Sequence, residues 1–155
     1  MSPRAACRLE SLGFSDVFDY VGGKRDWAGA GLPIEGQKVQ EPRIGSLARP
    51  DVPTARLGDK VSNIARRAES NGYDVAVVVT AGGVVLGILD PQALVASSSA
   101  SAEEVMRPGP ATYRPDLPVQ ELLEKLAPRH LRRALVTTPE GRLLGVFFTD
   151  GASSA

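Results

Sequence analysis

Two stretches of this chain are versions of one sequence. Residues 49–90 read RPDVPTARLGDKVSNIARRAESNGYDVAVVVTAGGVVLGILD, and residues 107–148 read RPGPATYRPDLPVQELLEKLAPRHLRRALVTTPEGRLLGVFF. A shift of 58 residues aligns them without a gap, and 11 of the 42 aligned positions are identical. Self-similarity at a fixed spacing predicts a supersecondary unit that occurs twice. The identical pairs are Arg49/Arg107, Pro50/Pro108, Thr54/Thr112, Arg56/Arg114, Val61/Val119, Ala76/Ala134, Val78/Val136, Thr80/Thr138, Gly83/Gly141, Leu86/Leu144 and Gly87/Gly145.

The apolar residues of each copy predict the same order of elements. They recur at helical spacing over residues 61–68 in the first copy and 119–126 in the second. Two apolar runs follow each helix, joined by a three-residue link that contains glycine, at 81–83 and 139–141. Such links between strand-forming segments indicate β-hairpins. Each copy is therefore predicted to form a short leading strand, a helix and two further strands.

Acidic residues are expected to cap both helices, and the copies are expected to pack together. Asp59 and Asp116 stand near the helix starts, where a carboxylate can accept free amide hydrogens. One copy of about 58 residues cannot cover all its core-facing surfaces by itself. The predicted fold class is α/β (α+β), with two strand-helix-strand-strand repeats packed with pseudo-twofold symmetry. The repeat domain is placed at 44–151, with repeat 1 at about 44–98 and repeat 2 at about 102–151.

Composition argues against several classes of function. The 18 basic and 18 acidic residues cancel, so no net field draws the protein to nucleic acid or to an anionic membrane. No apolar run approaches the roughly 18 residues that span a bilayer, and no secretory signal is visible. A cytoplasmic location is therefore expected. Cys7 and His130 are the sole residues of their types, so no Cys/His metal cluster or internal disulfide is predicted.

The repeat resembles the tandem CBS domain family over about residues 44–151. The resemblance rests on Glu-Glu-Val-Met-Arg-Pro at 103–108, on Arg-Pro-Asp at 114–116, and on Gly87 and Gly145 in the last strands. It implies a regulatory module that is not an enzyme and that forms a homodimer of disc-shaped pairs. It also implies that clefts between the repeats bind an adenosine-containing small molecule, plausibly an adenine nucleotide; no cofactor is implied.

The family's ribose signature is glycine, two apolar residues, Ser or Thr, and an Asp three positions further on. Here the last two positions hold Asp90 and Ala93 after Gly87, and Phe148 and Gly151 after Gly145, so the chain departs from the signature twice. The candidate ligand-binding residues are Thr54, Tyr73, Asp74 and Asp90 around the first copy, and Thr112, Arg132, Arg133, Thr149 and Asp150 around the second.

A purely structural interpretation of these residues stays open. Thr54 and Thr112 would then be ordinary strand residues and Tyr73 a packing aromatic, while Arg132 and Arg133 would be solvated. Asp90, which precedes a proline, would cap a helix. His130 is expected to be a solvated loop residue, because no serine or carboxylate stands near it in the sequence.

Residues 1–36 differ from the repeat in pattern. They predict a helix from Ser2 to Gly13, a strand at 14–21 and a short helix at 26–30, with a linker at 37–43. The sequence of this segment resembles the C-terminal end of a rhodanese domain, whose nucleophilic cysteine would lie upstream of Met1. Cys7 falls inside the predicted helix and is expected to be a small buried residue.

Three functions remain open at this point. The leading one is a ligand-sensing and dimerising regulatory module. The second is a truncated rhodanese-type sulfurtransferase fused to a CBS pair, which would be inactive without the cysteine loop. It requires that the chain start is internal to a longer product; the other explanation of the remnant is that it docks on the repeats or stays mobile. The third is a structural partner for another polypeptide.

Overall fold

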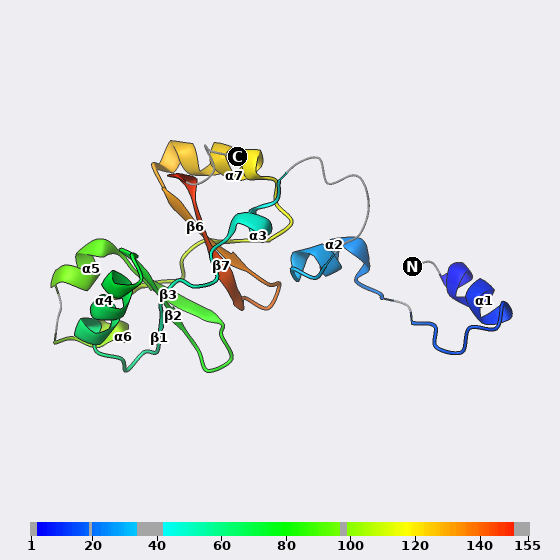
Figure 1. The fold of residues 1–155 in the computed structure, drawn as a ribbon, viewed down its shortest axis with the longest axis horizontal. Helices are drawn as coiled ribbons and strands as arrows, with labels where there is room; N and C mark the ends of the chain where they lie inside the picture. The colour runs from blue at the N-terminus through cyan, green and yellow to red at the C-terminus, as the bar shows by residue number, and fades with distance from the viewer. Residues whose placement is uncertain (1–2, 19, 34–41, 97–98, 151–155) are drawn as a thin grey trace.

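Each copy of the repeat forms a small β-sheet with a helix against it (Figure 1). The computed structural model describes residues 3–18, 20–33, 42–96 and 99–150. The first copy contains β1 (Thr54–Ala55), α4 (Val61–Ser70), β2 (Ala76–Val79) and β3 (Val85–Leu89). The second contains β5 (Thr112–Tyr113), α7 (Val119–Leu126), β6 (Arg133–Thr137) and β7 (Leu143–Phe148). The predicted order of strand, helix, strand and strand is confirmed in both copies.

Both sheets have the same topology. The leading strand runs parallel to the first hairpin strand, with Thr54 opposite Val77 and Thr112 opposite Leu135. The hairpin strands β2 and β3, and likewise β6 and β7, are antiparallel. A parallel pair needs a crossover connection, and α4 and α7 supply it. Equal registers in the two copies are what a duplicated folding unit requires.

Identical residues shape the two hairpin turns. Gly83 and Gly141 both have a φ of +80°, which glycine adopts without steric cost. The hydroxyl oxygens of Thr80 and Thr138 accept the backbone N–H groups of residues 84 and 142, at 3.1 and 3.3 Å. These contacts explain two of the identical pairs in the alignment, because each fixes the same turn.

A second identical pair holds each turn against the leading strand. The guanidinium of Arg56 donates to the carbonyl oxygens of Val79 (3.1 Å) and Thr80. Arg114 donates to the carbonyl oxygens of Thr137 (3.3 Å) and Thr138 in the second copy. Several carbonyls are satisfied by one planar donor group, a role that lysine could not fill equally well.

The segments before the two leading strands are exchanged between the sheets. β4 (Arg107–Pro108) begins the second copy but pairs with β3 of the first, with Arg107 opposite Ile88. Correspondingly, Arg49 begins the first copy but exchanges hydrogen bonds of 2.9 and 3.0 Å with Val146 of β7 in the second. The short helices α3 (Ile44–Leu47) and α6 (Ala102–Val105) lie directly before these segments in the chain. The repeat pattern alone did not predict this exchange.

Glycine permits the exchange at two equivalent positions. A β-carbon on Gly145 would lie 2.7 Å from the carbonyl oxygen of Arg49. A β-carbon on Gly87 would lie 2.5 Å from the sulfur of Met106 and 3.0 Å from the carbonyl oxygen of Arg107. Both glycines are therefore needed because an exchanged segment, at Met106 and Arg107 or at Arg49, approaches them closely.

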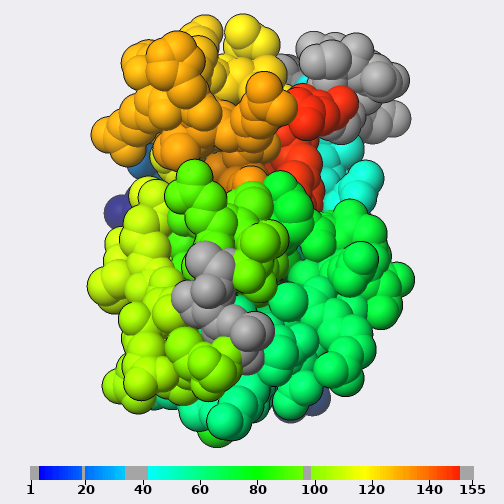
Figure 2. Space-filling model, turned by 90° about the vertical axis from the view of Figure 1, so that its left-hand side faces the viewer, coloured from blue at the N-terminus to red at the C-terminus, as the bar shows by residue number. Residues whose placement is uncertain are grey.

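The two copies share their apolar interior. Leu135 and Val146 of the second copy belong to the same buried cluster as Val77 and Ile64 of the first. Ile44 of α3 is buried with Leu122 and the other residues of the second cluster. The space-filling view shows the first copy (green) and the second (orange and red) in direct contact along a seam (Figure 2). The predicted fold, with two repeats that pack on each other, is confirmed.

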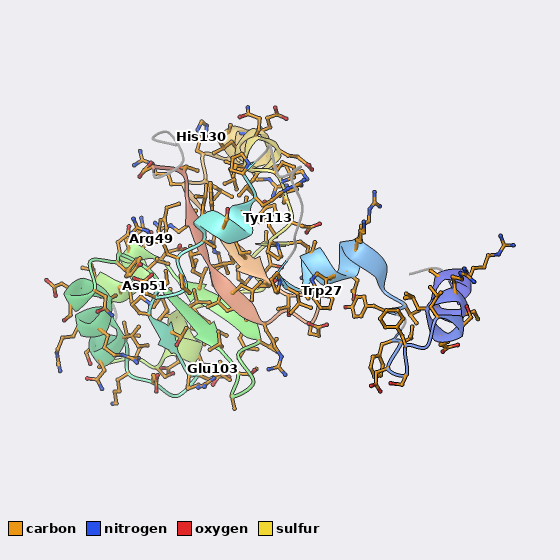
Figure 3. The ribbon with its side chains drawn as sticks, turned by 45° about the vertical axis from the view of Figure 1, so that its right-hand side comes forward. Trp27, Arg49, Asp51, Glu103, Tyr113 and His130 are labelled. Carbon is orange, nitrogen blue, oxygen red and sulfur yellow. The ribbon has the colours of Figure 1, made fainter. Side chains whose placement is uncertain are left out.

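The N-terminal segment contains two helices and no described strand. α1 (Pro3–Ser11) stands away from the sheets, and α2 (Gly23–Gly29) lies beside the second copy (Figures 1 and 3). The strand predicted at 14–21 is wrong for the residues described there, 14–18 and 20–21. Phe18 and Val21 are 83% and 94% exposed, and no neighbouring strand pairs with them. Cys7, expected to be buried, is exposed. Ser2 and residues 37–41 of the expected linker lie outside the described residues.

The predicted carboxylate caps are wrong, and a different cap is present. Neither α4 nor α7 has a side-chain cap at its first residue. Asp59 instead accepts the backbone N–H of Arg56 at 3.0 Å. A capping box begins α6, where the Glu104 carboxylate accepts the backbone N–H of Ser101 (2.7 Å) and its hydroxyl (2.9 Å).

Acid should weaken this capping box. The hydrogen bonds from Ser101 lower the pKa of Glu104 below its ordinary value of 4.5. Because the folded-state pKa is lowered, the stabilisation is present above pH 4.5 and is lost as the pH falls through the lowered value. We expect Glu104→Gln to lower the thermal unfolding midpoint at pH 7, and the difference from the unsubstituted chain to vanish in acid. Melting curves from pH 7 downwards test this, and a difference that is constant with pH would contradict it.

Candidate functional site

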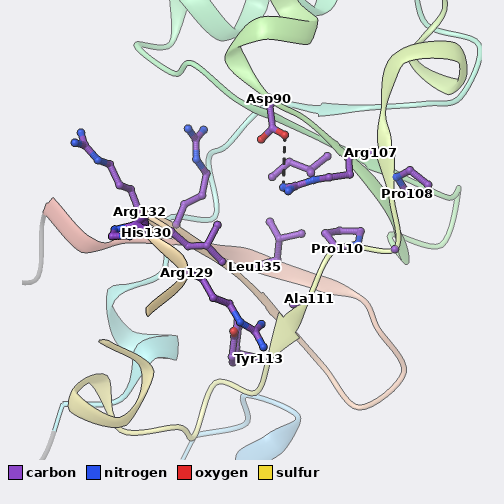
Figure 4. Close-up of a pocket in the computed structure, with 14 residues that line it drawn as sticks. Asp90, Arg107, Pro108, Pro110, Ala111, Tyr113, Arg129, His130, Arg132 and Leu135 are labelled. Carbon is purple, nitrogen blue, oxygen red and sulfur yellow. Dashed lines mark ion pairs between the residues drawn. The ribbon is translucent and has the colours of Figure 1, made fainter. Parts of the chain in front are cut away.

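A cleft of about 480 Å³ opens at one junction of the two copies (Figure 4). One wall is the end of β3 and the strand β4 that pairs with it. The other is the turn at 129–132 and the start of β6. The loop that joins β4 to β5 closes one side. Because both copies and the exchanged strand contribute, the cleft exists only in the assembled pair.

The floor of the cleft is apolar. Ile88 and Leu135 are 3% and 2% exposed and come from facing copies. Leu131 and Tyr113 are half-buried beside them. A flat apolar ring system would be desolvated against such a floor, which is the usual construction of a small-molecule site.

Charged groups surround this floor, and most of them are basic. Asp90 and Arg107 form an ion pair at 3.5 Å, seen in Figure 4 as the dashed contact. Arg129, His130 and Arg132 are exposed at the opposite wall. The arrangement offers one carboxylate for hydroxyl groups and several donors for an anion.

A left-handed residue forms the turn at the opposite wall. His130 has a φ of +51°, the only positive value at a non-glycine residue in the described part of the chain. The equivalent residue in the first copy is Gly72, with a φ of +73°. Such backbone conformations at non-glycine residues cost about 1 kcal/mol or more and are common at binding sites. His130 is solvated, as expected, but it lines the cleft.

The pseudo-symmetric counterpart of this cleft holds an aromatic pair, Tyr73 and Phe148, and is called the filled junction below. Tyr73 occupies the place of Leu131, and Phe148 the place of Asp90. Their rings lie 5.9 Å apart, and the guanidinium of Arg49 lies 5.7 Å from the Phe148 ring. Figure 3 shows Arg49 and Asp51 close together at this junction. Burial raises the pKa of Tyr73, and hydrogen bonding to Asp51 raises it further, while Arg49 opposes these effects.

Three of the sequence-predicted site residues come together in the open cleft. Asp90 of the first copy lies in the same cleft as Arg132 and Arg133 of the second. The sequence had grouped them by copy, but the cleft combines copies. Arg133 also reaches Asp74, with its two nitrogens 3.0 and 3.3 Å from the carboxylate oxygens.

The other predicted residues lie elsewhere. Tyr73 is buried in the filled junction, and Thr54 is exposed at the start of β1. Thr112 lines a wider space of about 1140 Å³ between α2 and the second copy. The hydroxyl of Thr149 donates to the Arg132 carbonyl at 3.2 Å and to the exposed Asp150 at 3.4 Å.

Sequence reasoning missed Arg107, Arg129 and His130 as cleft residues. Arg107 was visible as half of the first identical pair, but its position beside Asp90 depends on the exchanged strand. Arg129 and His130 follow a helix end and carried no sequence signal beyond their charge. Had the pairing of β4 with β3 been predicted, it would have placed Arg107 beside Asp90 in the cleft.

In the chain as described, no helix has both the length and the apolar character needed to cross a bilayer. Across residues 3–18, 20–33, 42–96 and 99–150, no group of three or more His, Cys, Asp and Glu side chains is placed to hold a metal ion.

The sulfurtransferase alternative gains no support from this geometry. Cys7 is exposed on α1, and the thiol has no hydrogen bond or ion pair among the described residues. A reactive cysteine would need nearby cations or free amides to lower its pKa. The resemblance of residues 1–36 to a rhodanese domain stays a prediction.

Comparisons with known proteins agree with the architecture. Residues 102–147 match the family model described as CBS domain. Among curated proteins, none matches the chain. The cytosolic domain of the Mg²⁺ channel MgtE in complex with ATP is 24% identical with a TM-score of 0.66, over 72% of this chain and 48% of that one. This chain thus spans about half the length of that domain.

Two further solved structures are matched over most of their own length. The CBS domain pair of protein MJ0100, in complex with 5′-methylthioadenosine and S-adenosyl-L-methionine, is 18% identical with a TM-score of 0.64, over 73% of this chain and 94% of that one. CBSX2 in complex with AMP is 14% identical with a TM-score of 0.66, over 72% and 93%. The two repeats therefore have the fold of a CBS domain pair, and the second of them also matches the CBS domain in sequence.

Proposed function

We propose that this protein is a regulatory CBS-pair module that binds an adenosine-containing small molecule in the open cleft. The observation that carries the proposal is the cleft itself, with its apolar floor, one carboxylate and a basic wall. Three structures of the same fold have ATP, S-adenosylmethionine with methylthioadenosine, and AMP in their complexes, which supports the ligand class.

The side chains suit the three parts of such a ligand. Ile88 and Leu135 would cover the faces of the base, where burial of apolar surface stabilises the complex. Asp90 would accept the ribose hydroxyls in place of the guanidinium that it now contacts. Arg107, released from that ion pair, would turn to the anionic end together with Arg132.

Ligand binding could regulate because the cleft joins the two copies. A ligand that contacts Asp90 and Arg132 together binds one relative arrangement of the copies better than any other. That difference in affinity is what shifts a conformational equilibrium. Homodimerisation, through which the shift would reach a partner, stays a prediction.

Calorimetric titration with AMP, ATP, NAD and S-adenosylmethionine tests the proposal. We expect at least one of them to bind, and Asp90→Asn to weaken that binding about tenfold because a charged hydrogen-bond acceptor is lost. Asp16→Asn is the matched control, since Asp16 is exposed in the N-terminal segment, accepts a hydrogen bond from Ser15 and does not line the cleft. If none of the four compounds binds at millimolar concentration, the proposal of ligand sensing is refuted.

A docking role is the second candidate, and one observation favours it. Of the nine exposed large apolar residues among those described, seven lie between positions 12 and 32. Exposed apolar patches of this kind are typical of interaction surfaces. This candidate would be the surviving one if no adenosine-containing compound bound.

A further inference from the structure

The open cleft has a strong excess of positive charge. Four of its lining residues are arginines, and the single carboxylate is Asp90. Two of the arginines are already paired, Arg107 with Asp90 and Arg133 with Asp74. Among the described residues, no ion pair joins Arg129 or Arg132 to a carboxylate. Two guanidinium groups that no carboxylate neutralises give this side of the cleft a positive field, which attracts an anion of high charge.

The filled junction differs in charge as well as in space. At the position of Arg132 it has Asp74, and at the position of Arg129 it has Asn71. The aromatic residues Tyr73 and Phe148 stand at the positions that Leu131 and Asp90 have in the open cleft. Although the two junctions descend from one repeated pattern, only the open one suits an anionic ligand.

We infer that each chain binds a single nucleotide with two or three phosphates, in the open cleft, and discriminates against uncharged or cationic adenosine compounds. This inference rests on the proposed function and narrows its ligand class. At neutral pH, S-adenosylmethionine carries a net charge of about +1, AMP about −2 and ATP about −4. Arg129 and Arg132 would bind the outer phosphates, and Arg107 the phosphate nearest the ribose once Asp90 holds the sugar.

Titration calorimetry with ATP, ADP, AMP, adenosine and S-adenosylmethionine measures the discrimination. We expect one ATP per chain, an affinity that falls from ATP to AMP, and a preference for ATP over S-adenosylmethionine of at least about 30-fold. Raising the salt concentration should weaken ATP binding much more than adenosine binding, because salt screens the exposed arginines.

Charge reversal at one position sharpens the test. We expect Arg132→Asp, which introduces the residue type of the equivalent Asp74, to weaken ATP binding about 100-fold and to leave adenosine within about twofold. Arg132→Gln should weaken ATP about tenfold. Arg66→Gln is the matched control, because Arg66 is exposed on α4 and does not line the cleft. The Arg132 side chain is exposed, so thermal melting should show both variants folded.

The outcomes separate the two levels of the hypothesis. If S-adenosylmethionine or adenosine binds as tightly as ATP, or if two nucleotides bind per chain, the inference fails while ligand sensing stands. Equal effects of Arg132→Asp on ATP and adenosine would also overturn it. If none of the compounds binds, the proposed function fails and the inference with it.

Discussion

Replacing Gly145 by alanine is expected to lower the free energy of unfolding by about 3 kcal/mol. The new β-carbon would lie 2.7 Å from the carbonyl oxygen of Arg49 and 2.9 Å from its carbonyl carbon. That backbone cannot withdraw freely, because Arg49 and Val146 are joined by two hydrogen bonds. Relief of the clash would therefore separate the exchanged segment from β7. Urea unfolding followed by circular dichroism measures the loss.

The matched control is Gly58→Ala. No atom lies within 4 Å of the β-carbon that this change would add, and the backbone there is not left-handed. The expected change is within about 0.5 kcal/mol. If the two substitutions lower the free energy of unfolding equally, the close approach of Arg49 to Gly145 is wrong. The exchange of segments would then be wrong as well.

Truncation of Ile44 is expected to have an effect of similar size. Ile44 lies before the first copy but is fully buried with Leu122 and Phe147 of the second copy. Ile44→Ala should lower the free energy of unfolding by about 3 kcal/mol, from lost apolar burial and from the cavity left behind.

Leu47→Ala serves as the comparison within the same short helix. Leu47 is 36% exposed and belongs to neither buried cluster. Its truncation should cost about 1 kcal/mol or less. Equal destabilisation by the two substitutions would show that α3 does not insert Ile44 into the core of the second copy.

Sequence predicted the repeated unit well because identical residues meet identical local demands. Gly83 and Gly141 form the same left-handed turn, and Arg56 and Arg114 satisfy the same carbonyls. Hydrophobic spacing also placed the helices, since α4 and α7 bury the residues that recur at helical spacing. Such local requirements can be read from the sequence without knowledge of the partner surface.

The sheet with which each segment pairs could not be predicted from the sequence. Periodicity says which face of a segment is buried, but not against which sheet. The exchange of β4 and of Arg49 decides that Asp90, Arg107 and Arg132 share one cleft. Asp90 and Arg132 were predicted by resemblance, whereas Arg107 needed the tertiary pairing. The predicted strand at 14–21 failed for a related reason, because apolar residues form a strand only beside another strand.

Exchange of the two segments has a consequence for synthesis on the ribosome. The first sheet gains its edge strand only after Arg107 has emerged, and its core is completed by Leu135 and Val146 near the far end of the repeat region. Residues around Ile44, translated early, must wait for β7 to reach their final place. Nascent chains of this protein therefore expose apolar surface until β7 has been synthesised, and exposed surface of that kind promotes aggregation.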